Sequence, residues 1–422
     1  MQGLSANSDL IDWLANIESS HPTEIDLGLD RVSEVARRLS IDLSQSKVIT
    51  VAGTNGKGST CALLESILLA SGFSTGVYGS PHFLEFNERI RLGGVNARDE
   101  IITHAFSRID EAKKELSLTY FEFATLAALL IFSEADLDFV VLEVGLGGRL
   151  DAVNIVDPNI AVITSISMDH VDWLGNTLED IGREKAGIFR QKTAAVVGLS
   201  EPMQSIIDHA ESLEAPMYVR DDSFRMDQGV SSWNWSGVDA SGDHVALLDL
   251  PLPNLPIQNA STVLQTLALI VPDLSLEAIY KGLSTARLPG RLQRERLGNA
   301  ELILDVAHNP EAAQYVASVL SNTHRHKRIT VVLGMLSDKD QKGVVDALRP
   351  VVDHWCLVSL QGPRACTALD LKPVLGDINA TLFDTTSHAL DELVTRCTDE
   401  DLILVCGSFL TVTETLLWLK TH

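Results

Sequence analysis

The chain has 422 residues, and its 33 basic against 57 acidic side chains give a formal net charge of −24. This length predicts two or three domains, each with its own core, and excludes a single small disulfide-stapled module. The negative charge repels polyanions, so nucleic-acid binding is disfavoured, and any phosphate ligand needs local positive charge.

Short apolar runs alternate with helical patterns in the first two thirds of the chain. Residues 48–52 form a β-branched run that stops at Gly53, and apolar residues at helical spacing follow over 63–68. Further buried strands are predicted over 139–142, 160–163 and 194–197. This alternation predicts an α/β domain with a mostly parallel sheet covered by helices on both faces.

A change of texture over residues 231–256, with tryptophans, glycines and three prolines, predicts irregular structure or a β-hairpin. A helix is predicted over 260–270. The segment 288–291, Leu-Pro-Gly-Arg, interrupts both helix and strand, so we place a domain boundary there, between residues 1–287 and 288–422.

The alternation restarts after this boundary. Strands are predicted over 302–304, 329–333, 355–358 and 402–405, with a helix from Pro310 and another at the C-terminal end. The second domain is therefore expected to be a smaller, Rossmann-like α/β unit.

The five cysteines are odd in number and include no C-x-x-C pair, so the sequence favours neither a disulfide framework nor a zinc site. The N-terminal residues lack a signal-peptide pattern, and the most apolar run, over 123–132, is too short to span a bilayer. We expect a cytoplasmic protein without a membrane partner.

A phosphate-binding loop is the strongest local signal, in the sequence Gly-Thr-Asn-Gly-Lys-Gly-Ser-Thr over residues 53–60. Glycines allow backbone N–H groups to converge on phosphate oxygens at a helix N-terminus. Lys57 is placed to reach the β- and γ-phosphates, and either Ser59 or Thr60 is placed to bind Mg²⁺. The match to the G-x-x-x-x-G-K-[ST] pattern is imperfect, and such a turn can also be a simple tight connection.

Two further clusters follow predicted strands. Glu143 comes directly after one of them and is either a metal ligand or a strand-end ion-pair residue. His170 lies beyond the next, and a lone histidine more often has a structural role. Since parallel strands end at one sheet edge, where α/β folds bind ligands, Ser59, Glu143 and His170 are expected to lie near one another. The segment from Gly145 fails as a dinucleotide fingerprint, because Leu150 occupies its last glycine position.

Taken together, these motifs resemble the folylpolyglutamate synthase and dihydrofolate synthase family, within the Mur-type amide ligases. The resemblance covers almost the whole chain and rests on residues 25–29, 53–59, 80–82, 119–122, 143–154, 169–170, 183–189, 288–293, 305–310 and 406–409. It implies a P-loop N-terminal domain and a C-terminal glutamate-ligase domain.

The resemblance also implies the roles of individual residues. Those matching the family's nucleotide contacts are Gly56, Lys57, Gly58, Ser59, Asn259, Arg291 and Asp305. Its magnesium positions match Ser80, Glu143 and His170, and its catalytic positions match Lys57, Lys185 and His170. Lys185 matches a lysine that the family carbamylates to bind a second Mg²⁺. If unmodified, it is expected to pair with Glu184 or a phosphate.

Residues matching the family's substrate segments are Asp26, Leu27, Gly28, Leu29, Thr119, Tyr120, Phe121, Glu122, Leu150, Asp151 and Ala152, with His308 and Ser408 as candidates for placing glutamate or closing the domains. Tyr120 and Phe121 also fit ordinary core packing. Arg89, Arg91 and Arg149 are candidates for holding an anionic substrate, and each fits equally well as an ion-pair residue.

The function implied is an ATP-dependent ligase that adds L-glutamate to dihydropteroate and to folates through an acyl phosphate, with ATP and two Mg²⁺ ions as the expected cofactors. Its expected partners are small molecules only, and a monomer is expected. The alternatives are a monofunctional folylpolyglutamate synthase, a cell-wall Mur ligase and a non-catalytic nucleotide-binding regulator.

Overall fold

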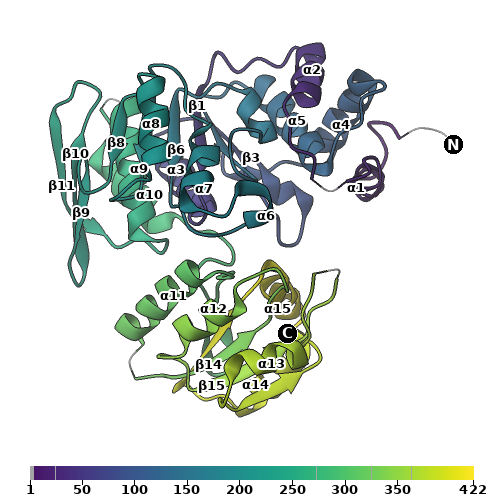
Figure 1. The fold of residues 1–422 in the computed structure, drawn as a ribbon, viewed down its shortest axis with the longest axis vertical. Helices are drawn as coiled ribbons and strands as arrows, with labels where there is room; N and C mark the ends of the chain where they lie inside the picture. Colours follow the sequence, from purple (N-terminus) through teal and green to yellow (C-terminus); the bar gives the residue numbers. More distant parts are fainter. Residues whose placement is uncertain (1–3, 24, 272, 325, 363) are drawn as a thin grey trace. The chain divides into compact units, whose positions relative to one another are not determined.

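The computed structural model describes residues 4–23, 25–271, 273–324, 326–362 and 364–422. The chain forms two compact units, Met1–Ala286 and Arg287–His422 (Figure 1). The boundary expected from the sequence lies one residue from this division. Among the described residues, none of the helices combines the length and apolar character needed to cross a bilayer.

An eight-stranded sheet organises the first unit, in the order β4-β3-β2-β5-β1-β6-β7-β8. Its strands are β1 (Lys47–Ala52), β2 (Thr75–Tyr78), β3 (Ile90–Leu92), β4 (Val95–Asn96), β5 (Phe139–Glu143), β6 (Ile160–Ile163), β7 (Ala194–Val197) and β8 (Met217–Val219). The neighbouring strands β2, β5, β1, β6, β7 and β8 pair in parallel. At the other end of the sheet, β3 pairs antiparallel with β2, and β4 pairs antiparallel with β3. The carboxyl ends of six strands therefore share one edge.

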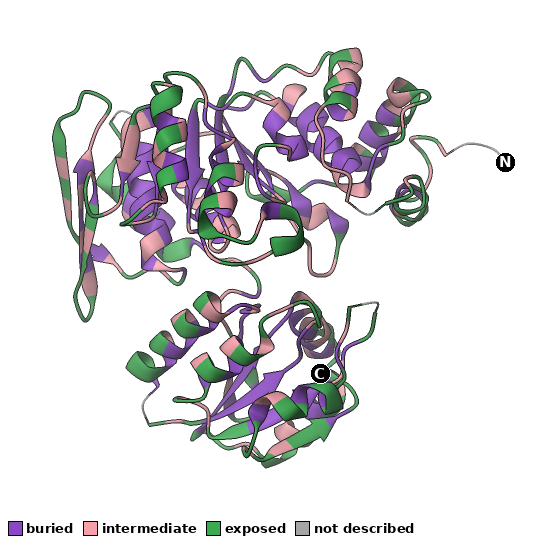
Figure 2. Cartoon of the chain, in the orientation of Figure 1, coloured by how far each residue is buried: buried purple, intermediate pink, exposed green. Residues whose placement is uncertain are grey.

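Helices cover both faces of this sheet (Figure 1). They are α1 (Leu10–Glu18), α2 (Asp30–Leu39), α3 (Lys57–Ala70), α4 (Asp99–Lys113), α5 (Tyr120–Ser133), α6 (Val171–Leu174), α7 (Leu178–Ala186), α8 (Gln204–Ser212), α9 (Ile257–Ile270) and α10 (Leu276–Thr285), with 3₁₀ turns η1 (Phe86–Arg89) and η2 (Ala152–Ile155). Central strands such as β1 are buried on both faces, which explains their continuous apolar sequence (Figure 2).

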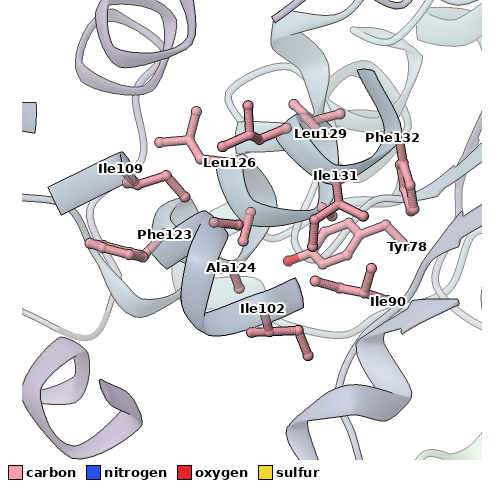
Figure 3. Packing of buried hydrophobic residues seen from close by; sticks show 14 of the residues in the cluster. Tyr78, Ile90, Ile102, Ile109, Phe123, Ala124, Leu126, Leu129, Ile131 and Phe132 are labelled. Carbon is pink, nitrogen blue, oxygen red and sulfur yellow. The ribbon is translucent and has the colours of Figure 1, made fainter. Parts of the chain in front are cut away.

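The largest core cluster of the first unit lies around α5. This helix is apolar on all sides because it is buried on all sides, and Phe123 and Leu126 pack in the same cluster as Ile102 and Ile109 of α4 (Figure 3). Burying each such side chain contributes about 1.5–3 kcal/mol. The core therefore holds the first turn of α5, with Tyr120, in a defined place.

A three-stranded antiparallel sheet, formed by β9 (Arg225–Gln228), β10 (Ser232–Val238) and β11 (His244–Pro251), covers the region where irregular structure or a hairpin was predicted. Trp233 and Trp235 of β10 are buried, and the Trp235 indole N–H donates to the Ser261 carbonyl of α9 at 3.1 Å. The hairpin alternative is confirmed, and the sheet supports the helix that carries Asn259.

The second unit contains a six-stranded sheet in the order β12-β13-β17-β14-β15-β16, with only β12 antiparallel. Its strands are β12 (Gln293–Leu297), β13 (Ala300–Leu304), β14 (Arg328–Leu333), β15 (His354–Val358), β16 (Ala380–Phe383) and β17 (Asp401–Cys406). Its helices are α11 (Pro310–Thr323), α12 (Gln341–Leu348), α13 (Ala368–Leu375), α14 (Thr386–Arg396) and α15 (Phe409–Thr421). The predicted two-domain α/β fold is confirmed.

Candidate functional site

The predicted phosphate loop connects β1 to α3 and passes very close to the end of β6. A Cβ atom at Gly53 would lie 1.8 Å from the Thr164 hydroxyl, so no other residue fits there without moving the loop. Gly56 is the N-cap of α3 with φ +86°, a conformation that favours glycine. Thr164 donates to the Asn55 carbonyl at 2.6 Å, which ties the loop to the neighbouring strand.

Two hydroxyls in the first turn of α3 are buried without a hydrogen-bond partner. These are the Ser59 Oγ and Thr60 Oγ1 atoms, and both residues are at most 1% exposed. A buried hydroxyl left unsatisfied costs about 1–3 kcal/mol, so such atoms point to a ligand that completes them. Their position at a helix N-terminus suits phosphate oxygens and a Mg²⁺ ion.

Two lysines donate to the same backbone carbonyl of this loop. The Nζ atoms of Lys57 and Lys185 both lie 2.9 Å from the Gly53 oxygen, and Lys57 also donates to the Thr54 oxygen at 3.3 Å. Lys185 is on α7 and is 4% exposed. The ion pair considered with Glu184 is not the contact that Lys185 makes, since Arg149 donates to the Glu184 carboxylate at 2.9 Å.

Burial is the main cause of the low pKa of Lys185. Together with the neighbouring Lys57 ammonium, it lowers the pKa of Lys185 to about 7, against the opposing effect of Asp169 and Asp151. Near neutral pH a large fraction of this amine is therefore uncharged and nucleophilic. A neutral amine is the form that adds to CO₂.

Glu143 ends β5 at the sheet edge predicted for the metal. Its Oε2 accepts from the Ser80 backbone N–H at 3.2 Å, and the residue is 7% exposed. Ser80 precedes a cis peptide bond to Pro81. A buried carboxylate held against the Ser80 backbone is the kind of hard oxygen donor that Mg²⁺ prefers, so Glu143 fits a magnesium ligand.

His170 lies beyond the end of β6, as the N-cap of α6, with φ +52°. Its Nε2 is 3.9 Å from the Asp169 carboxylate, and its side chain is 43% exposed. Within the described part of the chain, no three or more His, Cys, Asp or Glu side chains gather as a metal-binding group. The metal-ligand role of His170 stays a prediction.

Arg31 joins two of the predicted substrate segments. Its guanidinium pairs with Asp26 at 2.6 Å and with Glu122 at 3.0 Å. The other Glu122 oxygen accepts from the Thr119 N–H at 2.8 Å in a capping box that starts α5, and His21 lies 3.3 Å from Asp26. Residues 26–29 and 119–122, far apart in sequence, are thus held together.

Arg31 was not among the residues predicted from the sequence. One signal was present, because this cation lies in the first turn of α2, where the helix dipole disfavours positive charge. Nothing in the sequence, however, indicates that its partner Glu122 lies 91 residues away.

If residues 26–29 and 119–122 hold a pteridine acceptor, as the resemblance implies, replacing Arg31 by methionine is expected to raise the KM for that acceptor about tenfold and to leave the KM for ATP unchanged. The reason is that Glu122 is 3% exposed and loses its cation, which also costs about 2 kcal/mol of stability. Steady-state kinetics and thermal unfolding measure the two effects. The matched control is Arg37→Met, which removes an exposed cation of the same helix. Equal increases in both KM values would contradict a role in the acceptor segments.

The remaining segment of the first unit that was predicted to hold substrate, residues 150–152, is organised by Asp151. This buried carboxylate accepts from the N–H groups of Gly145, Leu146 and Val153 at 2.8–3.0 Å. Burial raises the pKa of Asp151 to about 6, in spite of these bonds. Leu150 and Ala152 flank it, so the segment following β5 is a structured loop.

Tyr120 and Phe121 are half-buried, which is intermediate between core and surface. The Phe121 ring packs against Tyr78 with centroids 6.0 Å apart, and Tyr120 meets Phe86 edge-on at 6.1 Å. Asn259 also belongs to this unit. A Cβ atom at Gly56 would lie 2.7 Å from the Asn259 amide, which places this side chain against the phosphate loop.

The other predicted residues belong to the second unit and cluster at the carboxyl edge of its sheet. Asp305 follows β13 and Ser408 follows β17, and these strands pair in parallel. The buried Asp305 carboxylate accepts from the Leu292 and Ala307 N–H groups, both at 2.9 Å. Burial raises the pKa of Asp305, and the nearby Arg291 opposes this.

Two more contacts define this second cluster. The Arg291 guanidinium lies 5.3 Å from the Phe409 ring centroid, and Nδ1 of His308 lies 3.0 Å from the Val306 carbonyl. The Ser408 hydroxyl accepts from the Thr411 N–H as the N-cap of α15. Ser408 thus has a structural task, whatever ligand contact it makes.

Comparisons with known proteins agree along the whole chain. The model of the Mur ligase middle domain matches residues 51–219, and that of the Mur ligase glutamate ligase domain matches residues 290–409. The dihydrofolate synthase/folylpolyglutamate synthase of Escherichia coli K12 is 46% identical over 411 residues, which cover 97% of this chain and 96% of that protein. The corresponding protein of Haemophilus influenzae is 43% identical, with 97% and 98% covered.

Solved structures give the same result. The structure of E. coli FolC in complex with DHPP and ADP has a TM-score of 0.94, with 45% identity and 99% of each chain covered. The structure of a bifunctional folylpolyglutamate synthase/dihydrofolate synthase with Mn, AMPPNP and L-glutamate bound has a TM-score of 0.91, with 46% identity and the same coverage.

Proposed function

Because this chain belongs to the dihydrofolate synthase/folylpolyglutamate synthase family of Mur ligases, we propose that it joins L-glutamate to dihydropteroate and to folates, with ATP as the energy source. The observation that carries the proposal is the group of residues at the carboxyl edge of the first sheet. There the glycine loop, two unsatisfied buried hydroxyls, Lys57 and the Glu143 carboxylate come from neighbouring strands.

The chemistry requires activation of a carboxylate, which is a poor electrophile at neutral pH. A carboxylate oxygen of the acceptor attacks the γ-phosphorus of ATP, the bond to ADP breaks, and an acyl phosphate forms. The glutamate amine then attacks the acyl carbon, and the tetrahedral intermediate releases inorganic phosphate and a proton. Each step exchanges one leaving group for one nucleophile, so no further reactant is needed.

The residues of the loop stabilise the first of these steps. The backbone N–H groups of residues 56–59 and the Lys57 ammonium are proposed to hold the phosphates and to neutralise charge on the transferring oxygens. Ser59, Ser80, Glu143 and His170 are proposed to hold Mg²⁺, which supplies charge neutralisation when bound. Asn259 is proposed to contact the nucleotide beside the loop.

Lys185 is proposed to become a carbamate. Its neutral amine adds to CO₂ and loses a proton, which replaces a buried cation by an anionic oxygen group. This change removes the repulsion between Lys185 and Lys57 and supplies oxygen ligands for a second Mg²⁺. The lowered pKa supports this assignment, because an ordinary lysine is almost fully protonated at neutral pH.

The extent of carbamate formation is expected to rise with pH between 6 and 8. The pKa of Lys185 is about 7, so the neutral fraction grows from a small to a large part of the molecules over this range. The measurement is the activity that CO₂-depleted enzyme regains on addition of bicarbonate at each pH, with dissolved CO₂ held constant. Recovery that is independent of pH would contradict a reacting group with this acidity.

The segment 119–122 and the loop 150–152 are proposed to hold the pteridine acceptor, together with Asp26, Leu27, Gly28 and Leu29. Arg31 ties Asp26 of this last segment to Glu122. In the second unit, Arg291 and Asp305 are proposed as nucleotide contacts, and His308 and Ser408 as candidates for placing glutamate. These assignments rest on the match of each residue to the motifs of the family, and Asp305 and Ser408 also follow strands that pair in parallel in the second sheet.

The test of the proposed function compares dihydropteroate with tetrahydrofolate as acceptor, in the presence of L-glutamate and MgATP. A bifunctional enzyme releases ADP with both acceptors, and only when glutamate is present. Release with tetrahydrofolate alone would identify a monofunctional folylpolyglutamate synthase. Absence of release with both would refute the proposal.

A further inference from the structure

Three arginines in the first unit were candidates for holding an anionic substrate, and the structure separates them. Arg91 pairs with Glu65 at 2.6 Å, and Arg149 pairs with Glu184 at 2.9 Å. Arg89 makes no ion pair with a carboxylate of the described residues. Two of the candidates are therefore neutralised within the protein, and one is not.

Arg89 is buried as well as unpaired. It is 9% exposed, and its Nε donates to Nδ1 of His82 at 2.8 Å. Its guanidinium carbon lies 5.3 Å from the ring centroid of Tyr120 and 5.8 Å from that of Phe86. Aromatic rings compensate only part of the desolvation of a cation, and a buried charge without a counter-ion costs several kcal/mol.

The nearest carboxylate in sequence is committed elsewhere. Glu88 accepts from the backbone N–H groups of Phe83, Leu84 and Glu85 at 2.7–2.9 Å, in the capping box of η1. Its two oxygens thus organise the loop after Ser80 and are not directed to Arg89. The loop is built in a way that leaves the guanidinium without an anion.

Arg89 has contacts toward both the proposed metal-binding edge and the proposed acceptor segment. Its backbone carbonyl accepts from the Gly79 N–H at 2.9 Å, one residue before Ser80, whose own N–H donates to Glu143. Its guanidinium contacts Tyr120, which begins α5 in the proposed acceptor segment. The unpaired cation is thus tied to the metal-binding edge and to the aromatic wall of the acceptor site.

We propose that Arg89 binds a carboxylate of the pteridine acceptor, with the half-buried Tyr120 ring beside the acceptor's aromatic ring. This inference rests on the proposed function and deepens it. Guanidinium matches a carboxylate with two parallel hydrogen bonds, and a neighbouring aromatic ring suits an aryl acid. The carboxylate has two sources, the benzoate group of dihydropteroate or the α-carboxylate of the glutamate that ends a folate.

The test measures how strongly each carboxylate contributes to binding, with and without Arg89. Dissociation constants are measured in the presence of MgADP for two ligand pairs. The first pair is dihydropteroate and its analogue without the carboxylate. The second is tetrahydrofolate and the tetrahydropteroyl derivative of γ-aminobutyrate, which lacks only the α-carboxylate.

The wild-type protein is expected to prefer the complete ligand of at least one pair by about tenfold to a hundredfold, the range of a charge-assisted hydrogen bond. Arg89→Gln is expected to remove most of that preference, and Arg89→Lys to retain part of it. The pair that loses its preference identifies the source of the carboxylate. The control is Arg108→Gln, because Arg108 carries the same charge as Arg89 but is more exposed and pairs with Glu134. This variant is expected to keep the preference for the complete ligand.

The proposal is overturned if Arg89→Gln weakens complete and truncated ligands equally, since Arg89 would then only support the wall of the site. If that variant does not fold, an unchanged preference in Arg89→Lys has the same meaning, because lysine lacks the two-pronged geometry. A wild-type protein that binds none of the four pteridines would instead refute the proposed function itself.

Discussion

Replacing Lys57 by alanine is expected to lower kcat about 10³-fold or more while the protein stays folded. Its ammonium is the cation of the phosphate loop, and removing one pre-organised donor from a reacting oxygen typically costs 10²–10³-fold or more in rate. In the structure this group donates to two backbone carbonyls of its own loop, a contribution of about 1 kcal/mol each that stability can absorb. Glutamate-dependent ADP release and thermal unfolding measure the two effects.

A matched control is available on β1, the strand that precedes the phosphate loop. Lys47, at the amino end of β1, donates to the Ile270 carbonyl at 2.8 Å, and the phosphate loop follows the opposite end of this strand. Lys47→Ala therefore removes a similar hydrogen bond without removing the phosphate contact, and it should keep near-normal turnover. If Lys57→Ala were as active as Lys47→Ala, the assignment of the phosphate loop would be wrong.

Replacing Lys185 by alanine is expected to abolish most activity, by about 10²-fold or more, and added short carboxylic acids are expected to restore part of it. The buried space left by the side chain lies against the Gly53 carbonyl, where acetate or propionate can supply the oxygen ligands of the lost carbamate. Removing a buried amine also removes its desolvation cost, so the variant should fold. Activity is measured as a function of acid concentration.

Lys185→Arg is the informative companion variant. Arginine keeps a cation at this position but does not form a carbamate, and it leaves no room for a small acid. It should be inactive with or without acetate. Full activity of Lys185→Arg, or equal activity of Lys185→Ala with and without added acid, would count against a carbamate.

The central fold could be predicted because its signals are local. The run 160–163 and the run 194–197 correspond to β6 and β7 residue for residue, since a strand buried on both faces must be apolar throughout. The strand β2 was missed because Gly76, which has no side chain, interrupts its apolar pattern. The helix predicted from residue 260 begins at Ile257, directly after Pro256.

The contacts that build the site were harder to predict because they join distant residues. The Gly53 carbonyl meets Lys185 from 132 residues away, and Arg31 meets Glu122 from 91 residues away. Such pairs leave no periodic pattern in a single sequence. The three candidate arginines were likewise indistinguishable until their partners were known, because burial and pairing, and not residue type, separate Arg89 from Arg91 and Arg149.

The most direct test of the proposed reaction follows the oxygen atoms of the acceptor. Dihydropteroate labelled with ¹⁸O in its carboxylate is incubated with the enzyme, MgATP and L-glutamate, and the released inorganic phosphate is analysed by mass spectrometry. An acyl phosphate leaves one carboxylate oxygen on the phosphate, so each phosphate should carry one ¹⁸O. Glutamate-dependent release of phosphate without label would contradict activation of the carboxylate by the phosphate loop.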